Sequence, residues 1–149
     1  MKQPFLFETS AGGIVVRNAT HGQEWLVIQH AGKKHWGFPK GHIADNIKDE
    51  SMLDAALREV QEEGGIEAKV LFETPYQIKY FFKRGVVLHK KRVAFYLMEY
   101  ISGDPADHDH EIEEAKFVST AEVAEILTFA SEKKAFQWAL KMYKNVEKK

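Results

Sequence analysis

The sequence predicts an α+β fold in which a mixed β-sheet is flanked by helices. Several runs of apolar and β-branched residues have the length and alternation of strands, and three segments are typical of helices. Their order along the chain lacks the regular strand–helix alternation of a parallel α/β protein. With 149 residues, the chain is expected to form one domain spanning residues 1–149.

The first predicted elements are two strands and a short extended segment. Residues 10–17 and 24–30 are expected to pair, because residues 18–22 between them carry turn-forming side chains. Residues 35–39 are predicted to be extended, since Pro39 disfavours the helical conformation at the residue before it.

Residues 51–63 form the clearest predicted helix. Its buried stripe follows the i, i+3, i+4, i+7 pattern and consists of Leu53, Ala56, Leu57 and Val60. Short polar residues at positions 49–51 can cap its start, and Gly64 and Gly65 can end it.

The second half of the chain is predicted to hold further strands and two helices. The expected strands are 68–72, 76–82, 86–100 and 115–119, with a hairpin tip at 83–85 and an acidic loop at 103–111. The expected helices are 121–129 and 132–145, capped by Thr120 and Ser131 respectively.

Composition excludes several classes of protein. With 44% apolar and 12% aromatic residues, the chain can bury a core, which excludes a disordered or coiled-coil protein. The absence of cysteine excludes disulfide frameworks, zinc–thiolate sites and thiol nucleophiles. No run approaches the ~20 apolar residues of a membrane span, and the first five residues lack the apolar run of a signal peptide. A cytoplasmic protein without a membrane partner is therefore expected.

The formal net charge of −1 averages over strongly segregated charges. Residues 45–67 hold eight acids and two bases, and residues 104–114 hold six acids and no base. Residues 79–92, by contrast, hold six bases and no acid. The total argues against bulk coating of nucleic acid. The same near-zero net charge would also result from an acidic metal site that faces basic strands able to hold phosphate.

Three glutamates on the predicted helix form the most informative pattern. Glu59, Glu62 and Glu63 are spaced i, i+3, i+4, which places them on one helical face. Like charges at this spacing destabilise a helix, and negative charge near its C-terminus opposes the helix dipole. Hard divalent cations, which take oxygen ligands, would turn this arrangement into a site. A solvated acidic face remains the alternative for three glutamates alone.

These residues resemble the sequence box of the Nudix hydrolase family, to which MutT-like proteins belong. The family pattern is G, five residues, E, seven residues, then R-E-U-x-E-E-x-G-U, with U a bulky aliphatic residue. Here Glu50 is followed by seven residues and then by REVQEEGGI at positions 58–66, which matches the second half throughout. The first half departs, because eight residues separate Gly41 from Glu50 and Ala44 stands at the strict glycine position. We interpret Gly41 as the motif glycine, with a three-residue insertion within residues 44–49.

The resemblance extends beyond the box to most of the chain. Residues 10–16 resemble the opening strand of the family. Segments 36–42, 91–97 and 111–118 are similar to the subgroup that cleaves dinucleoside polyphosphates. The resemblance implies a Nudix-type α/β/α sandwich. It also implies Mg²⁺- or Mn²⁺-dependent hydrolysis of a nucleoside diphosphate linked to another moiety.

The resemblance assigns roles to the box residues. It implies metal binding by Glu59, Glu62 and Glu63, with Glu50 and the carbonyl of Gly41 as additional candidates. Arg58 is expected to orient a carboxylate through a bidentate contact, or to pair with Glu50. The general base is a box glutamate in some family members and an acid from a C-terminal loop in others. We favour Glu111 in this loop, against the alternative of a merely solvated acidic segment. The expected catalytic residues are therefore Arg58, Glu59, Glu62 and Glu111.

The candidate substrate-binding residues are Lys40, His42, Lys91, Tyr76 and Tyr80. The two lysines, with Lys90 and Arg92, could hold distal phosphates, although basic residues also protect strand edges. His42 is the best candidate among the histidines for a phosphate contact. The two tyrosines share a strand face and could stack a base, although aromatic residues at period two are more often core.

The leading functional prediction is hydrolysis of a dinucleoside polyphosphate such as diadenosine polyphosphate. Removal of pyrophosphate from the 5′ end of RNA, and hydrolysis of nucleoside triphosphates, are the alternatives within enzymes. A non-catalytic nucleotide-binding module is the alternative from another class, and the intact box counts against it. RNA is not favoured as a partner because the sequence shows no broad basic surface. Both a monomer and a homodimer are compatible with the sequence.

Overall fold

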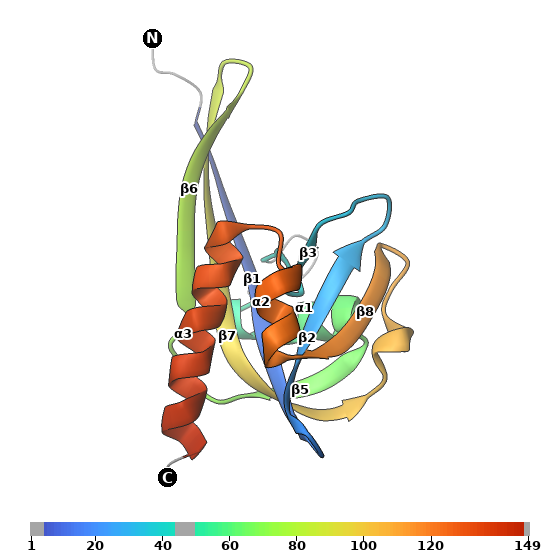
Figure 1. The fold of residues 1–149 in the computed structure, drawn as a ribbon. Coiled ribbons are helices and arrows are strands. Elements are labelled where there is room, and N and C mark those ends of the chain that lie inside the picture. The colour runs from blue at the N-terminus through green and yellow to red at the C-terminus, as the bar shows by residue number, and fades with distance from the viewer. Residues whose placement is uncertain (1–4, 44–49, 148–149) are drawn as a thin grey trace.

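The computed structural model describes residues 5–43 and 50–147 (Figure 1). Its strands are β1 (Phe5–Ala19), β2 (Gly22–His30), β3 (Trp36–Gly37), β4 (Lys40–His42), β5 (Ile66–Val70), β6 (Tyr76–Arg84), β7 (Val87–Gly103) and β8 (Ile112–Ser119). Its helices are α1 (Met52–Gly64), α2 (Thr120–Ile126) and α3 (Ala130–Glu147), with a 3₁₀ turn, η1, at Pro105–Asp107. The predicted three-residue insertion lies within residues 44–49, outside the described residues.

The strands form one mixed sheet of eight strands. Its main path runs β3-β2-β1-β7-β5, while β4 pairs with β1, β6 with β7 and β8 with β2. The long strands β1 and β7 run parallel, with Phe5 opposite Leu88 at one end and Val16 opposite Glu99 at the other. All other pairings are antiparallel.

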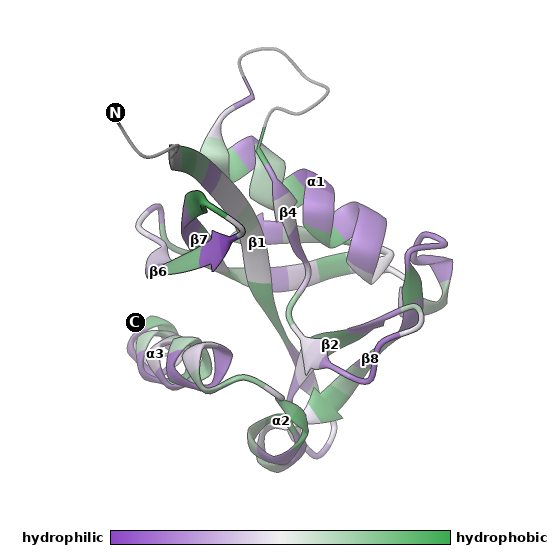
Figure 2. Ribbon diagram, turned by 90° about the horizontal axis from the view of Figure 1, so that it is seen from above, coloured by the Kyte–Doolittle hydropathy of each residue, from purple (hydrophilic) through white to green (hydrophobic). Residues whose placement is uncertain are grey.

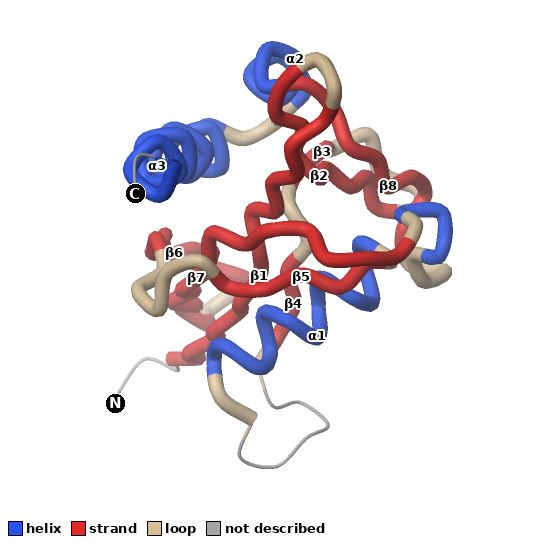
Figure 3. Tube along the Cα trace, turned by 90° about the horizontal axis from the view of Figure 1, so that it is seen from below, coloured by secondary structure: helices blue, strands red, loops and turns tan. Residues whose placement is uncertain are grey.

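Helices cover both faces of the sheet, which confirms the predicted α/β/α sandwich. Figures 2 and 3 show α1 on one side and α2 and α3 on the other. Successive residues of a strand point to opposite faces, so a strand buried on both faces is apolar throughout. In β1, Ile14 and Val16 join the core cluster that includes α2 and α3, whereas Val15 joins the cluster formed with Val60 of α1.

Several predicted boundaries and caps differ from the structure. The predicted helix 121–129 ends at Ile126, and its cap is Ser119, whose hydroxyl accepts from the Glu122 amide. Thr120 is not the cap, because its hydroxyl accepts a hydrogen bond from the Trp25 indole at 2.9 Å. Ser131 also does not cap α3, which already begins at Ala130.

Two further differences concern strands near the candidate site. β1 begins at Phe5 rather than at residue 10, because its first residues pair with the extended part of β7. Residues 40–42, for which the sequence predicts no strand, form the short strand β4 against β1, with Ser10 opposite His42. None of the described helices is long and apolar enough to cross a membrane. The cytoplasmic location stays a prediction.

Candidate functional site

Helix α1 is fixed at both ends, and this positions its glutamates. The Ser51 hydroxyl caps the first turn by accepting from the Asp54 amide at 3.0 Å. At the other end Gly65 has φ 72°, and its amide donates to the Gln61 carbonyl at 3.0 Å. The acidic loop before β8 passes directly over this end, because the Asp109 amide donates to the Glu62 carbonyl at 2.8 Å. The two acidic segments of the sequence therefore meet in space.

A cavity of about 460 Å³ lies where β1, β4, β7, α1 and this loop converge. It is lined by Ser10, Lys40, Gly41, His42, Arg58, Glu59, Glu62, Glu63, Lys91 and Glu111. All of these except Ser10 are predicted from the sequence. Ser10 is a buried polar residue at the beginning of an apolar run, and its register with His42 brings it to the cavity.

Arg58 binds the carboxylates around it. Its Nε and Nη2 donate to the two carboxylate oxygens of Glu50 at 2.7 and 2.9 Å, a bidentate contact. Its Nη1 also donates to Glu59 at 2.9 Å and reaches Glu62 at 3.3 Å. These contacts, the Glu50 hydrogen bond first, raise the pKa of the guanidinium further above its ordinary value. The Glu50 side chain is only 4% exposed and lies outside the cavity lining, so the structure places it as the partner of Arg58.

Glu59 lies against the backbone of Gly41. A Cβ atom at position 41 would overlap the Glu59 carboxylate, so only glycine permits this approach. Burial raises the pKa of Glu59, while the neighbouring Arg58 opposes that rise.

Gly41→Ala is therefore expected to displace the Glu59 carboxylate and to reduce catalytic activity. A methyl group here would overlap the carboxylate, so the Glu59 side chain must shift to make room for it. The expected loss in kcat/KM is about tenfold to a hundredfold, the range typical for a disturbed ligand environment. The rise in melting temperature on adding Mn²⁺ checks the cause, because it should shrink in the variant. An unchanged Mn²⁺-induced shift would contradict the placement of Glu59.

Glu63 is the most deeply buried of the three box glutamates. Its Oε1 accepts from the Lys40 amide at 3.0 Å, and its Oε2 lies 3.8 Å from Nε2 of His30. Burial raises the pKa of Glu63 to about 8, more than the amide hydrogen bond lowers it.

The oxygen donors of the cavity fit a hard divalent cation, although their side chains are not arranged around a single ion position. Among the residues described, no group of three acidic or histidine side chains is arranged to hold a metal ion. The Arg58 guanidinium contacts both Glu59 and Glu62, so these two carboxylates are directed toward it. The three box carboxylates and the Gly41 backbone are nevertheless on the wall of one cavity, and oxygen donors are the ligands that Mg²⁺ and Mn²⁺ prefer.

A more apolar cleft of about 440 Å³ adjoins this cavity, and Lys40 lines both. Tyr80 lines the cleft, together with Phe129 and Glu132. Tyr76 does not line it, because its ring packs on Trp138 of α3 at a centroid distance of 5.7 Å. The sequence does not predict Phe129 as a site residue, because it assigns Phe129 to a helix. In the structure α2 ends at Ile126, and Phe129 lies beyond it on the wall of the cleft.

A smaller cleft of about 220 Å³ is also lined by Phe129. It is lined by residues that include His35, Trp36, Lys40 and Glu132. The buried Glu132 also lines both clefts, and its carboxylate Oε1 accepts from the Phe38 amide at 3.4 Å.

Glu132→Gln is expected to stabilise the fold increasingly as the pH rises. Burial raises the pKa of Glu132 above its ordinary value of 4.5, so its contribution to stability is complete below pH 4.5. That contribution is lost as the pH rises through the pKa of the folded protein, because the buried carboxyl must then ionise. Glutamine carries no charge and keeps an acceptor for Phe38. Urea unfolding at acidic and at mildly alkaline pH measures the effect, with the exposed Glu125→Gln as control. A pH-independent difference from the wild type would contradict it.

Of the three consecutive bases at positions 90–92, the cavity receives only Lys91. Burial lowers the pKa of its ammonium group. Because side chains alternate along a strand, Lys90 and Arg92 project from the opposite face of β7. Lys90 there lies over the rings of Phe7 and Phe81.

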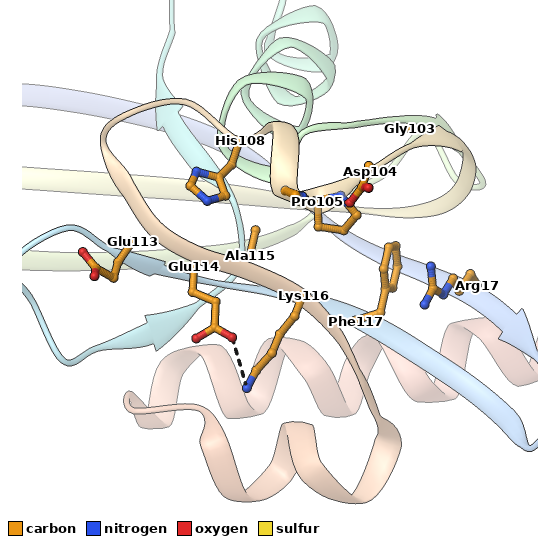
Figure 4. Close-up of a pocket in the computed structure, with 11 residues that line it drawn as sticks. Arg17, Gly103, Asp104, Pro105, His108, Glu113, Glu114, Ala115, Lys116 and Phe117 are labelled. Atoms are coloured by element: carbon orange, nitrogen blue, oxygen red, sulfur yellow. Dashed lines mark hydrogen bonds and ion pairs between the residues drawn. The ribbon is translucent and has the colours of Figure 1, made fainter.

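A separate hollow lies between η1 and β8 (Figure 4). Its volume is about 660 Å³. The hollow contains none of the box residues, and its Lys and Arg side chains are already engaged. Lys116 lies 3.6 Å from Glu114, and Arg17 both pairs with Glu24 at 2.8 Å and covers the Phe117 ring at 3.9 Å. We therefore assign the candidate site to the cavity of the three glutamates.

The fold and this cavity define an α/β/α protein that presents clustered carboxylates beside cationic groups. Residues 7–141 match the NUDIX domain family, and the chain belongs to that family. A putative mutator protein, MutT4 of Mycobacterium tuberculosis, is 33% identical over 133 residues, covering 85% of this chain and 52% of that protein. A Bis(5′-nucleosyl)-tetraphosphatase [asymmetrical] of Rattus norvegicus is 49% identical over 49 residues, 32% of this chain and 31% of that protein. The chain thus spans about half, or less, of the length of these relatives.

Solved structures show the same fold. The Caenorhabditis elegans Ap4A hydrolase in a binary complex has a TM-score of 0.71 and 22% identity, covering 87% of this chain and 93% of that chain. The NUDIX domain of Shewanella oneidensis NrtR, complexed with ADP ribose, has a TM-score of 0.68 and 15% identity. The match covers 96% of this chain and 90% of that chain.

Proposed function

We propose that this chain is a divalent-metal-dependent pyrophosphohydrolase whose substrate is a dinucleoside polyphosphate. The observation that carries the proposal is a single cavity lined by Glu59, Glu62 and Glu63 together with Lys40 and Lys91. Carboxylates alone would repel a polyphosphate, and lysines alone would not activate water. Both together, in one cavity, suit hydrolysis of a phosphoanhydride.

Nudix hydrolases generally use divalent metal ions. Here the three glutamates, with the carbonyl of Gly41, would hold Mg²⁺ or Mn²⁺. Such an ion, when bound, neutralises phosphate charge and lowers the pKa of a coordinated water.

The chain's own residues bind and orient the reactants. Lys40 and Lys91 provide positive charge for phosphate oxygens, and Arg58 fixes the orientation of Glu59 through the 2.9 Å contact. Glu111 is the favoured acceptor of the proton from the attacking water. Its backbone is held on both sides, because its amide donates to the Asp109 carboxylate at 3.1 Å and its carbonyl accepts from Ala31 at 2.9 Å.

Two clefts favour a substrate with a nucleoside at each end. The cleft with Tyr80 and the cleft with Trp36 both reach the glutamate cavity at Lys40, and Phe129 lines both. Aromatic side chains offer a stacking surface to any base. Likeness to proteins named Ap4A hydrolase and Bis(5′-nucleosyl)-tetraphosphatase supports the same substrate class.

A substrate panel with product identification tests this proposal. The panel contains diadenosine tetraphosphate, nucleoside triphosphates, ADP-ribose and 5′-triphosphorylated RNA, each with Mg²⁺, with Mn²⁺ and with chelator. The expected result is metal-dependent turnover that is fastest for diadenosine tetraphosphate. Faster turnover of RNA or a nucleoside triphosphate would contradict the substrate class. Binding without turnover of any compound would instead identify a nucleotide-binding module.

Phe129→Ala is expected to raise the KM for diadenosine tetraphosphate with little change in kcat. The ring lies 48% exposed on the wall of both clefts, where it can stack a base without contacting the reacting phosphate. Loss of one base–aromatic stack corresponds to about fivefold or more in KM. Phe129→Tyr is the matched control and should retain the wild-type KM. An unchanged KM in the alanine variant would exclude both clefts as base sites.

A further inference from the structure

The outer parts of β1, β6 and β7 form a three-stranded extension that projects beyond the helices (Figure 1). The register places Phe7, Lys90 and Phe81 in one row across its strands. Phe7 is 64% exposed and Phe81 is 60% exposed. Lys90 lies between the rings, with Nζ 5.0 Å from the Phe7 centroid and 5.5 Å from the Phe81 centroid. We call these three residues the aromatic row.

Cationic residues flank the aromatic row on the same face, because residues directly opposite in neighbouring strands share a face. The row on one side contains Thr9, Arg92 and Lys79. The row on the other side contains Leu88 and Lys83. With Lys90, four bases and two exposed rings therefore share one face. Among the described side chains of these three rows, none is acidic.

A groove connects this face to the glutamate cavity. It has a volume of about 630 Å³ and is lined by residues that include Phe7, Thr9 and Arg92. His42 lines both the groove and the cavity. Glu8 also borders the groove, but its carboxylate lies 3.6 Å from Nδ1 of His89. A chain whose phosphates occupied the cavity could continue along the groove onto the aromatic row.

We propose that this face binds single-stranded RNA, with bases stacked on Phe7 and Phe81 and phosphates held by Lys79, Lys83, Lys90 and Arg92. Exposed rings interspersed with cations are the features by which proteins bind single strands without reading sequence. A second copy of the chain fits this face less well, because a two-fold contact would bring the same four cations together. The choice of RNA rests on the proposed function, since an RNA whose 5′ end is joined through a polyphosphate to a second nucleoside would present the dinucleoside polyphosphate that the cavity is proposed to hydrolyse.

The docking can be tested without using the cavity, by fluorescence anisotropy with a labelled RNA oligonucleotide that has a 5′ hydroxyl. We expect binding that weakens with salt, with log K falling by about 2.8 per decade of salt if all four cations contact phosphates. Phe81→Ala should weaken binding by about fivefold or more, whereas Phe81→Tyr should retain it. Lys90→Gln should lower the salt slope by about 0.7. Ile101→Ala, which removes an exposed apolar side chain elsewhere, is the matched control.

Hydrolysis by the same variants separates this proposal from the function of the cavity. Phe81→Ala should keep the wild-type melting temperature and hydrolyse diadenosine tetraphosphate normally. Glu59→Gln should lose hydrolysis but keep RNA binding. The proposal is overturned if RNA does not bind with a salt dependence, or if Phe81→Ala binds as well as the wild type.

Two further results would assign the face to another partner and so overturn the proposal. One is binding to phosphatidylserine vesicles, lost in Phe81→Ala, without RNA binding. The other is a dimer in sedimentation that Phe81→Ala dissociates.

Discussion

Glu62→Gln is expected to lower kcat by about a hundredfold or more and to leave the fold intact. The Glu62 side chain is 47% exposed, so its charge contributes little to stability, yet it lines the cavity beside Glu59 and Glu63. Glutamine keeps the shape and removes the negative charge that a divalent cation requires. Several kcal/mol of transition-state stabilisation depend on such a cation, and 1.36 kcal/mol corresponds to a factor of ten.

Steady-state kinetics with Mg²⁺ held saturating measure this effect. Glu67→Gln is the matched control, because Glu67 is exposed on β5, outside the cavity lining, and should keep the wild-type rate. A Glu62→Gln protein that retained the full rate would refute the proposed metal role of this carboxylate.

Arg58→Met is expected to destabilise the protein by about 3 kcal/mol, because it leaves the buried Glu50 carboxylate without its bidentate partner. The 4% exposure of Glu50 prevents water from replacing the guanidinium. The guanidinium itself is 26% exposed, which places the expected loss at the lower end of the range for buried pairs. Chemical unfolding without added metal measures the loss.

The double variant Arg58→Met, Glu50→Met tests the physical reason. Removing both charges should recover much of the lost stability, since the cost arises from a buried carboxylate that has lost its guanidinium partner. Arg17→Met is the matched control: Arg17 pairs with Glu24, both side chains are about one-third exposed, and less than about 1 kcal/mol should be lost. Additive losses in the double variant would contradict the account.

The sequence predicts the part of the site that depends on one helix. Spacing along α1 is local, so Glu59, Glu62 and Glu63 could be placed on one face from their positions alone. Their different exposures could not be predicted this way. Glu59 and Glu63 turn toward the sheet and are buried, whereas Glu62 stands at the rim, and this depends on how the helix rests on β1.

Features that depend on pairing between distant parts of the chain could not be predicted from the sequence. The strand β4 exists because it pairs with β1, and Ser10 reaches the cavity through the same pairing. Phe129 lines two clefts because α2 stops early. Ser119 and Thr120 are both acceptable caps by residue type, and the Thr120 hydroxyl instead accepts from the Trp25 indole, which is distant in sequence.

The basic segment at residues 79–92 is likewise only partly predictable from the sequence. Six bases in residues 79–92 can be counted in the sequence, and the period of two predicts that neighbours diverge. Which face meets the cavity depends on the parallel pairing of β1 with β7, which places Lys91 opposite Glu8 and Lys90 opposite Phe7. Lys91 therefore lines the cavity, and Lys90 lies in the aromatic row.

The most direct test of the central proposal is hydrolysis of diadenosine tetraphosphate in ¹⁸O-labelled water, with products resolved by mass spectrometry. With Mg²⁺, we predict two nucleotide products, one of which carries a single ¹⁸O atom from the attacking water. With chelator, or with Glu62→Gln, we predict almost no product. Equal product formation with chelator would contradict the account, as would intact substrate in the presence of Mg²⁺.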